Sequence, residues 1–164
     1  MRRLIFMMLM LGLVPCLASA QTTDEHHGQG YAFVAPGGAS GGGATVTTLH
    51  IGGGGEGLLY KGLGVGGELG YWGPTKSFGD GVGLLSVNGS YHVLPRNSDR
   101  KVVPFVTAGY SLAFRSATAN LFNFGGGINY WISKRVGLRF EFRDHVWFAG
   151  PVHYWGFRIG VAFR

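Results

Sequence analysis

Six charged residues lie in strand-like stretches rich in glycine and small side chains, and ion pairing is the chemistry that they favour. Three are acids and three are bases, and Glu141 stands two residues from both Arg139 and Arg143. Alternate side chains of a strand share a face, so these three point the same way. Buried charges are tolerated when they are paired and hydrogen-bonded. We therefore predict one internal ion-pair network, although some members could instead be solvated at a wet end; its residues are Glu56, Glu68, Arg139, Glu141, Arg143 and Arg158.

Signatures of catalysis or of cofactor binding are weak. The glycine runs at 37–43 and 52–55 are not followed by Gly-Lys-Ser/Thr, so they are interpreted as flexible or space-making rather than phosphate-binding. The six histidines lack zinc-ligand spacing, and His26-His27 is interpreted as part of a solvated tail rather than a weak metal site. Two triplets, His145-Val146-Trp147 and His153-Tyr154-Trp155, lack the serine nucleophile of a lipid deacylase. We expect no enzyme activity, no cofactor and no metal.

The N-terminus is typical of a secretory signal peptide over residues 1–20. A basic start, Met1-Arg2-Arg3, precedes an apolar stretch from Leu4 to Leu17, which is too short to cross a bilayer as a helix. Ala18-Ser19-Ala20 then forms a small-x-small cleavage site. A lipoprotein signal cut before Cys16 is the alternative, but Pro15 stands where a small residue is normal. Residues 21–28 are polar and are expected to form a short mobile lead-in.

The composition argues against a water-exposed globular surface. Only 13% of the residues are charged, about half the usual share for globular proteins. Loss of Arg2 and Arg3 from the 14 basic residues leaves 12 against 8 acidic residues, a net charge of +4. Such a modest charge gives no support to nucleic-acid binding. Cys16 is the only cysteine, so the chain after cleavage would contain no disulfide.

Eight strand-like segments of alternating polarity follow the lead-in, and no sustained helical periodicity is present. Their short connections and even number predict an all-β fold, an eight-stranded antiparallel up-and-down transmembrane β-barrel over residues 29–164 with both termini at one end. A flexible glycine-rich loop is expected at 36–44. The expected strands are 29–35, 45–60, 63–72, 82–94, 102–114, 120–132, a seventh from 136 and an eighth after the turn at Gly150-Pro151.

The apolar positions are expected to face lipid, because the other positions are too small and too uncharged to face water. Asp144 breaks the pattern on the apolar side, which places it near the edge of the apolar band or in a bulge. Aromatic girdles are predicted at both ends. With a periplasmic N-terminus, the outer girdle holds Tyr71, Trp72, Phe114, Phe122, Trp147, Phe148 and Trp155, and the inner one holds Tyr60, Tyr91, Tyr130, Trp131 and Phe163.

These features resemble the small eight-stranded outer-membrane barrels of the OmpA and OmpX type, the outer membrane protein beta-barrel domain family. The resemblance covers residues 29–164 and rests on the signal peptide, the strand rhythm, the segment Pro104-Phe105-Val106-Thr107-Ala108-Gly109-Tyr110 and the final strand. It implies that the last strand is an assembly signal. That signal ends in an aromatic residue in the family, whereas Arg164 follows Phe163 here. The expected signal residues are Trp155, Phe157, Ile159, Val161 and Phe163.

The resemblance implies a monomeric integral protein of the cell outer membrane with a closed polar lumen and a structural, envelope or surface role. Eight strands leave no aqueous bore, so a wide pore is not expected. The expected partners are outer-membrane lipid and lipopolysaccharide, and during biogenesis the barrel-assembly machinery and periplasmic chaperones. Three alternatives stay open: a lipid A-modifying barrel enzyme, a surface adhesin, for which the outer loops are short, and a soluble barrel.

Overall fold

The computed structural model describes residues 28–41, 43–93, 101–150 and 152–164. The predicted signal peptide at 1–20, with Cys16, and the lead-in up to residue 27 lie outside the described residues. Gly28, the last residue of the expected lead-in, already begins the first strand. Within the described ranges, no helix is long and apolar enough to cross a membrane.

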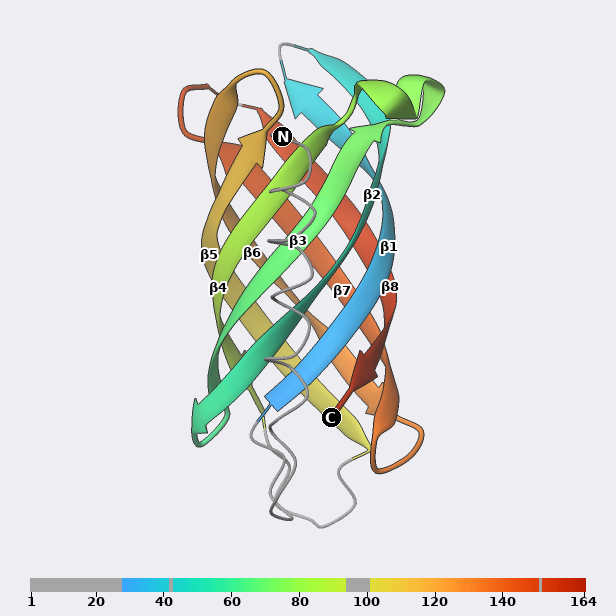
Figure 1. The fold of residues 1–164 in the computed structure, drawn as a ribbon, viewed down its shortest axis with the longest axis vertical. Helices are drawn as coiled ribbons and strands as arrows, with labels where there is room; N and C mark the ends of the chain where they lie inside the picture. Colours follow the sequence, from blue (N-terminus) through green and yellow to red (C-terminus); the bar gives the residue numbers. More distant parts are fainter. Residues whose placement is uncertain (1–27, 42, 94–100, 151) are drawn as a thin grey trace, which may run out of the picture.

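Eight antiparallel strands form a closed up-and-down barrel, which confirms the expected fold class (Figure 1). Each strand pairs with its neighbours in the chain, and β8 closes the barrel against β1. The start of β1 and the C-terminus lie at the same end. A short 3-10 segment, η2 (Thr75–Asp80), connects β3 to β4. The strands are β1 (Gly28–Gly41), β2 (Ala44–Tyr60), β3 (Leu63–Pro74), β4 (Val82–His92), β5 (Val102–Phe114), β6 (Thr118–Trp131), β7 (Val136–Trp147) and β8 (His153–Phe163).

The expected loop at 36–44 is wrong, because β1 continues through this segment to Gly41 and β2 begins at Ala44. Glycine permits close contact between β1 and β8 here. A Cβ on Gly37 would lie only 2.0 Å from the carbonyl oxygen of Trp155. Pro36 is tolerated at a gap in the β1–β8 ladder, where its missing N–H is not required. The glycine run therefore extends the barrel wall instead of leaving it.

Side chains alternate between the two faces of the barrel wall, with a shift in register between Leu58 and Tyr60 at the end of β2. Val87, Phe140 and Ile159 are examples of the large apolar residues that remain exposed on the outside. Ser86, Glu141 and Arg158 are examples of the polar and charged residues that are buried inside. Large apolar groups thus cover the exterior, and the buried interior is mainly polar, which is the reverse of a water-soluble barrel.

Two tryptophans depart from the predicted girdles. Trp72 and Trp131 are only 9% and 5% exposed, because their places in the strand alternation direct them into the lumen. Trp72 shares its phase with Glu68, so strand parity overrides the interfacial preference of the indole. A third tryptophan, Trp147, shares the inward phase of Glu141 and pairs with buried Leu121, but it lies at the last position of β7 and is 36% exposed. Phe148 is exposed in the turn after β7. The other aromatic residues expected at the ends occupy outward positions: Tyr60, Tyr71, Tyr91, Phe114, Phe122, Tyr130, Trp155 and Phe163.

Asp144 lies in a regular part of β7. The strand pairs in continuous register with both β6 and β8 across this position, so the bulge alternative is wrong. Its carboxylate is on the outward face, where it contacts the His153 ring at 2.7 Å. A carboxyl group is thus present on the outward face of the barrel.

Glycines where strands approach closely give a first testable prediction. A Cβ on Gly127 in β6 would lie 2.0 Å from the carbonyl oxygen of Phe140, so the strands would have to separate. We expect Gly127→Ala to lower the free energy of unfolding by about 1–3 kcal/mol. Gly89→Ala is the control, because its Cβ would meet only a carbonyl oxygen at 3.8 Å. Urea unfolding in detergent would measure both, and equal losses would contradict the steric explanation.

Candidate functional site

The charged cluster in the lumen begins with three neighbours on β7. Arg139, Glu141 and Arg143 all point inward, and Glu141 lies between the two guanidinium groups. Arg139 Nε donates to Glu141 Oε2 at 3.1 Å, and Arg143 Nη2 lies 2.5 Å from Glu141 Oε1. The alternation of a strand is sufficient to bring these three together.

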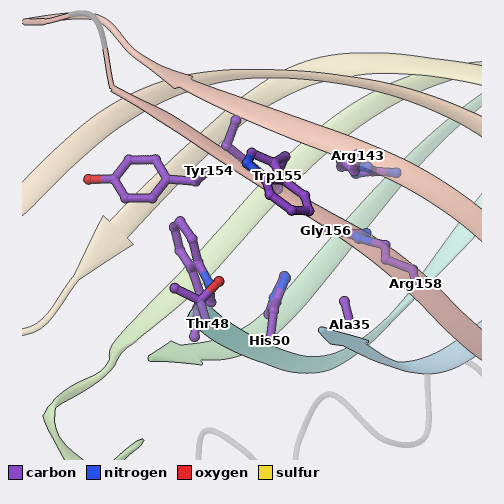
Figure 2. A pocket seen from close by; sticks show the side chains of 10 residues that line it. Ala35, Thr48, His50, Arg143, Tyr154, Trp155, Gly156 and Arg158 are labelled. Atoms are coloured by element: carbon purple, nitrogen blue, oxygen red, sulfur yellow. The ribbon is translucent and has the colours of Figure 1, made fainter. Parts of the chain in front are cut away.

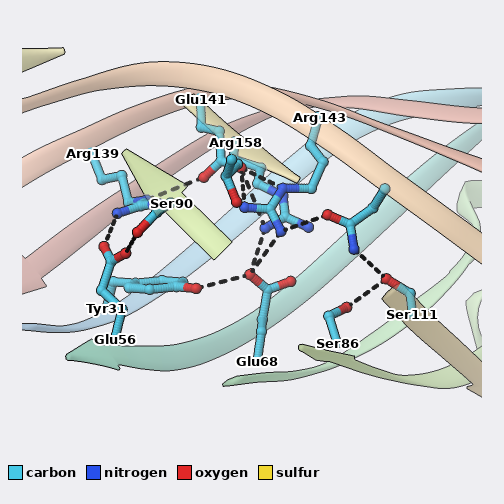
Figure 3. A network of polar contacts seen from close by, with 12 residues as sticks. Tyr31, Glu56, Glu68, Ser86, Ser90, Ser111, Arg139, Glu141, Arg143 and Arg158 are labelled. Atoms are coloured by element: carbon cyan, nitrogen blue, oxygen red, sulfur yellow. Dashed lines mark hydrogen bonds and ion pairs between the residues drawn. The ribbon is translucent and has the colours of Figure 1, made fainter. Parts of the chain in front are cut away.

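A second carboxylate joins this strand to the opposite wall. Glu68 on β3 reaches across the lumen, and its Oε2 lies 2.6 Å from Arg158 Nη1 and 3.7 Å from Arg143 Nη1. Arg158 on β8 is directly opposite Glu141 in the strand register and approaches it to 3.8 Å. The Tyr31 hydroxyl also donates to Glu68, at 3.1 Å. These contacts connect β1, β3, β7 and β8 (Figure 3).

The third carboxylate, Glu56 on β2, lies closer to the end that holds the start of β1 and the C-terminus. Its Oε1 accepts from Arg139 Nη1 at 3.2 Å and from the Gln29 side-chain amide. Its Oε2 accepts from Ser90 at 2.5 Å and lies 3.2 Å from His92 Nε2. The structure therefore brings all six predicted charges into one connected network, with three carboxylates matched by three guanidinium groups.

Polar and aromatic residues that the sequence interpretation missed complete the packing. A hydrogen-bonded chain leads from Arg143 through Asn123 and Ser111 to Ser86, at 3.4, 2.9 and 2.8 Å (Figure 3). Aromatic rings cover two guanidinium groups. Cζ of Arg139 lies 4.3 Å from the ring centroid of Tyr31 and 3.9 Å from that of Phe105. Cζ of Arg158 lies 4.3 Å from the ring centroid of Phe33. Strand phase was the available signal, since Tyr31 and Phe33 alternate with outward Ala32 and Val34.

Apolar packing closes the lumen toward the end that holds the C-terminus. The buried apolar cluster consists of Tyr31, Phe33, Ala35, Val103, Trp131 and Ala162, of which Ala35 lies beside the cavity in the other half of the lumen. Arg164, the last residue, lies over the Trp131 ring at 4.0 Å, and its Nε donates to the carbonyl of Lys134 at 3.0 Å. Arg164 thus ties the end of the chain to the turn between β6 and β7.

The other half of the lumen contains a small cavity below an aromatic cluster. Trp72 and Tyr154 meet edge to face with ring centroids 4.4 Å apart, and His50 and His145 lie beside Trp72. Figure 2 shows Tyr154 and His50 among the residues that line the cavity. The cavity has a volume of about 10 Å³, which is enough for about one water molecule. A cavity of this size leaves no room for an organic substrate or a hydrated ion. The arrangement is suited to holding strands together rather than to transport or chemistry.

The final strand shows the expected two faces. Phe157, Ile159 and Phe163 are exposed on the outside, with Val161 slightly less so, and Trp155 is half-buried against β1. A Cβ on Gly38 would lie 3.0 Å from the Trp155 indole, so the ring lies close along that strand. These positions are geometry alone, and their role as an assembly signal stays a prediction.

Comparisons with known proteins agree with this architecture. No protein-family model and no curated protein matches the chain. Among solved structures, the Neisserial surface protein NspA matches with a TM-score of 0.62 and 14% identity, over 84% of this chain and 96% of that one. The attachment invasion locus protein Ail of Yersinia pestis matches with 0.61 and 11%, over 85% and 99%. The N-terminal barrel domain of Pseudomonas aeruginosa OprF matches with 0.59 and 16%, over 83% and 98%.

The chain has the fold of the small outer-membrane barrels. The near-complete coverage of three such proteins shows that the barrel accounts for almost the whole of each matched chain. At these identities, the match concerns architecture, and fold alone does not assign a function. The fold therefore establishes the architecture, and function must be inferred from the individual side chains.

Proposed function

We propose that this protein is a monomeric integral barrel of the outer membrane, with its termini in the periplasm and a sealed lumen. We further propose a structural, envelope or surface role without catalysis. The observation that carries the proposal is the inverted distribution of polarity. Large apolar side chains cover the outside, and a matched set of three carboxylates and three guanidinium groups is buried inside. Lipid is the surrounding that suits such an exterior.

The contacts in the lumen favour a closed barrel rather than an open pore. Ion pairs cross from β3 to β8, the aromatic cluster covers one half, and Trp131 with Arg164 covers the other. We expect planar-bilayer recordings of the purified full-length protein to show no large steady conductance. Large, stable single-channel steps would contradict the sealed lumen. Heat-modifiable migration on a denaturing gel would verify that the recorded protein is folded.

The two other functions have less support. Ail is by its name a protein of attachment and invasion, but adhesion needs an extended outer surface. Here the connections at the end opposite the C-terminus are short, and Arg115 in the turn after β5 donates to the carbonyl of Asp80 in η2 at 2.6 Å. A lipid A-modifying activity has less support because neither His145-Val146-Trp147 nor His153-Tyr154-Trp155 contains the serine nucleophile of a deacylase motif. An unchanged lipid A mass spectrum after expression in an outer membrane is the expected result.

The proposed partners follow from the proposed location. Outer-membrane lipid and lipopolysaccharide would contact the apolar exterior, and the assembly machinery with periplasmic chaperones would handle the unfolded chain. The last strand is proposed as the assembly signal, with Phe163 facing outward one residue before the end. Arg164 belongs to the folded structure, because its backbone N–H donates to the carbonyl of Arg135 at 3.0 Å.

A further inference from the structure

One polar group on the exterior has no role in the lumen network. Asp144 on β7 faces outward and is nine-tenths buried, and its Oδ2 lies 2.7 Å from Nδ1 of His153 on β8. Its other oxygen, Oδ1, is buried and accepts no hydrogen bond from the described residues. An ionisable side chain at the lipid face of a barrel is unfavourable, so its presence points to a function.

The histidine of this pair is oriented for binding. Its Nδ1 is engaged by the carboxylate, and its side chain is 47% exposed, which leaves Nε2 as the available ring nitrogen. Depending on its proton, Nε2 can donate to a phosphate or accept from a hydroxyl. The carboxylate fixes the ring, because the contact is a short one between two adjacent strands.

Hydroxyl and indole groups surround the histidine on the same face. Ser40 on β1 is directly opposite His153 in the strand register, and Thr45 on β2 is directly opposite Ser40. Trp155 is the cross-strand neighbour of Asp144. We name these five residues the rim patch, since they lie toward the end of the barrel opposite the C-terminus: Ser40, Thr45, Asp144, His153 and Trp155.

We propose that the rim patch binds the sugar-phosphate headgroup of an outer-leaflet glycolipid. The patch offers hydrogen-bond donors and acceptors on four adjacent strands, which suits the hydroxyls of a sugar ring. Trp155 supplies the amphipathic surface that is favoured where hydrocarbon meets headgroups. A phospholipid headgroup has fewer hydroxyl groups to satisfy such a set. The inference rests on the proposed function, because the patch meets the outer leaflet only if the termini are periplasmic.

The experiment compares lipid retention in bilayer nanodiscs. Full-length protein is reconstituted in nanodiscs of phosphatidylethanolamine and phosphatidylglycerol with a minor fraction of lipid A. The protein is then released from the nanodiscs, and the lipid that stays bound to it is identified by native mass spectrometry. We expect lipid A to be enriched on the wild-type protein. We expect His153→Ala and Asp144→Asn to reduce that enrichment by about tenfold, the equivalent of one charge-assisted hydrogen bond. Thr118→Ala, an exposed outward hydroxyl on β6 at the same end, is the matched control and should retain full enrichment.

Several outcomes would overturn the inference. Equal enrichment in all variants, or enrichment of phospholipid instead, would show that the rim patch is not a glycolipid site. If lipid A bound to the wild-type protein has lost an acyl chain, and lipid A bound to Ser40→Ala has not, the rim patch hydrolyses the lipid instead of only binding it. Heat-modifiable migration, measured on each sample, separates the two proposals. A barrel that folds in lipid without enriching lipid A contradicts this inference alone, and a chain that stays soluble without lipid contradicts the proposed function.

Discussion

Replacing Glu141 with glutamine is expected to lower the free energy of unfolding by about 3–5 kcal/mol. The side chain is 1% exposed and lies 2.5 Å from Arg143, 3.1 Å from Arg139 and 3.8 Å from Arg158. The amide would leave three guanidinium groups facing two carboxylates in a lumen with little room for water. Uncompensated buried charge is the main cause of the expected loss. Urea unfolding in detergent micelles, followed by tryptophan fluorescence, would measure it.

Asp80→Asn is the matched control for this substitution. It makes the same change from acid to amide, but Asp80 is 73% exposed and lies 3.6 Å from a half-exposed Arg115. Exposed ion pairs contribute below about 1 kcal/mol, so little change is expected. A loss at Glu141 no larger than that at Asp80 would refute the role given to the network. A second variant that also replaces Arg143 with methionine should recover part of the loss, since the charges balance again.

Arginine in place of Ile159 is the second substitution with a large expected effect. Ile159 is exposed near the middle of β8, between outward neighbours Phe140 and Val34 on the adjacent strands. If lipid surrounds the barrel, a charge at this depth costs about 2–4 kcal/mol. The amount of heat-modifiable protein in the outer membrane should fall accordingly, and unfolding from lipid vesicles should require less urea.

Val136→Arg is the corresponding control near the barrel end. Val136 is also β-branched and outward, but it is the first residue of β7. A charge near the interface costs only about 0–1 kcal/mol, because the side chain can extend toward the headgroups. A soluble barrel would tolerate both substitutions equally. Equal tolerance would therefore argue against the membrane location itself.

The fold could be predicted because strand alternation is a local property with a global consequence. Alternation in the final strand and in β7 defines which side chains face outward, and eight such segments with short connections close only as a meander. Strand alternation does not reveal the strands at 36–44, because glycine has neither a polar nor an apolar side chain and so shows no period. Its pairing depends on the close approach of β8, which a one-dimensional pattern does not contain.

The candidate sites divide in the same way. Arg139, Glu141 and Arg143 are grouped by their spacing, whereas the partners Glu56 and Glu68 come from strands whose separation across the lumen depends on barrel size. The pairing of Asp144 with His153 required the β7–β8 register, because neither residue suggests the other by spacing. The alternation of side chains along β3 and β6 is enough to place Trp72 and Trp131 inward, but the usual preference of tryptophan for membrane interfaces suggests the opposite.

The bridge between Glu68 and Arg158 has a consequence for how the barrel forms. Its partners are 90 positions apart in the chain, so the contact arises only after the last strand has arrived. A partial sheet that entered hydrocarbon earlier would present bare charges and an open strand edge, both of which lipid excludes. For a barrel that inserts into a bilayer, we therefore expect sheet closure, charge neutralisation and insertion to occur as one cooperative step. Without the final strand, we expect the unclosed chain to remain outside the bilayer.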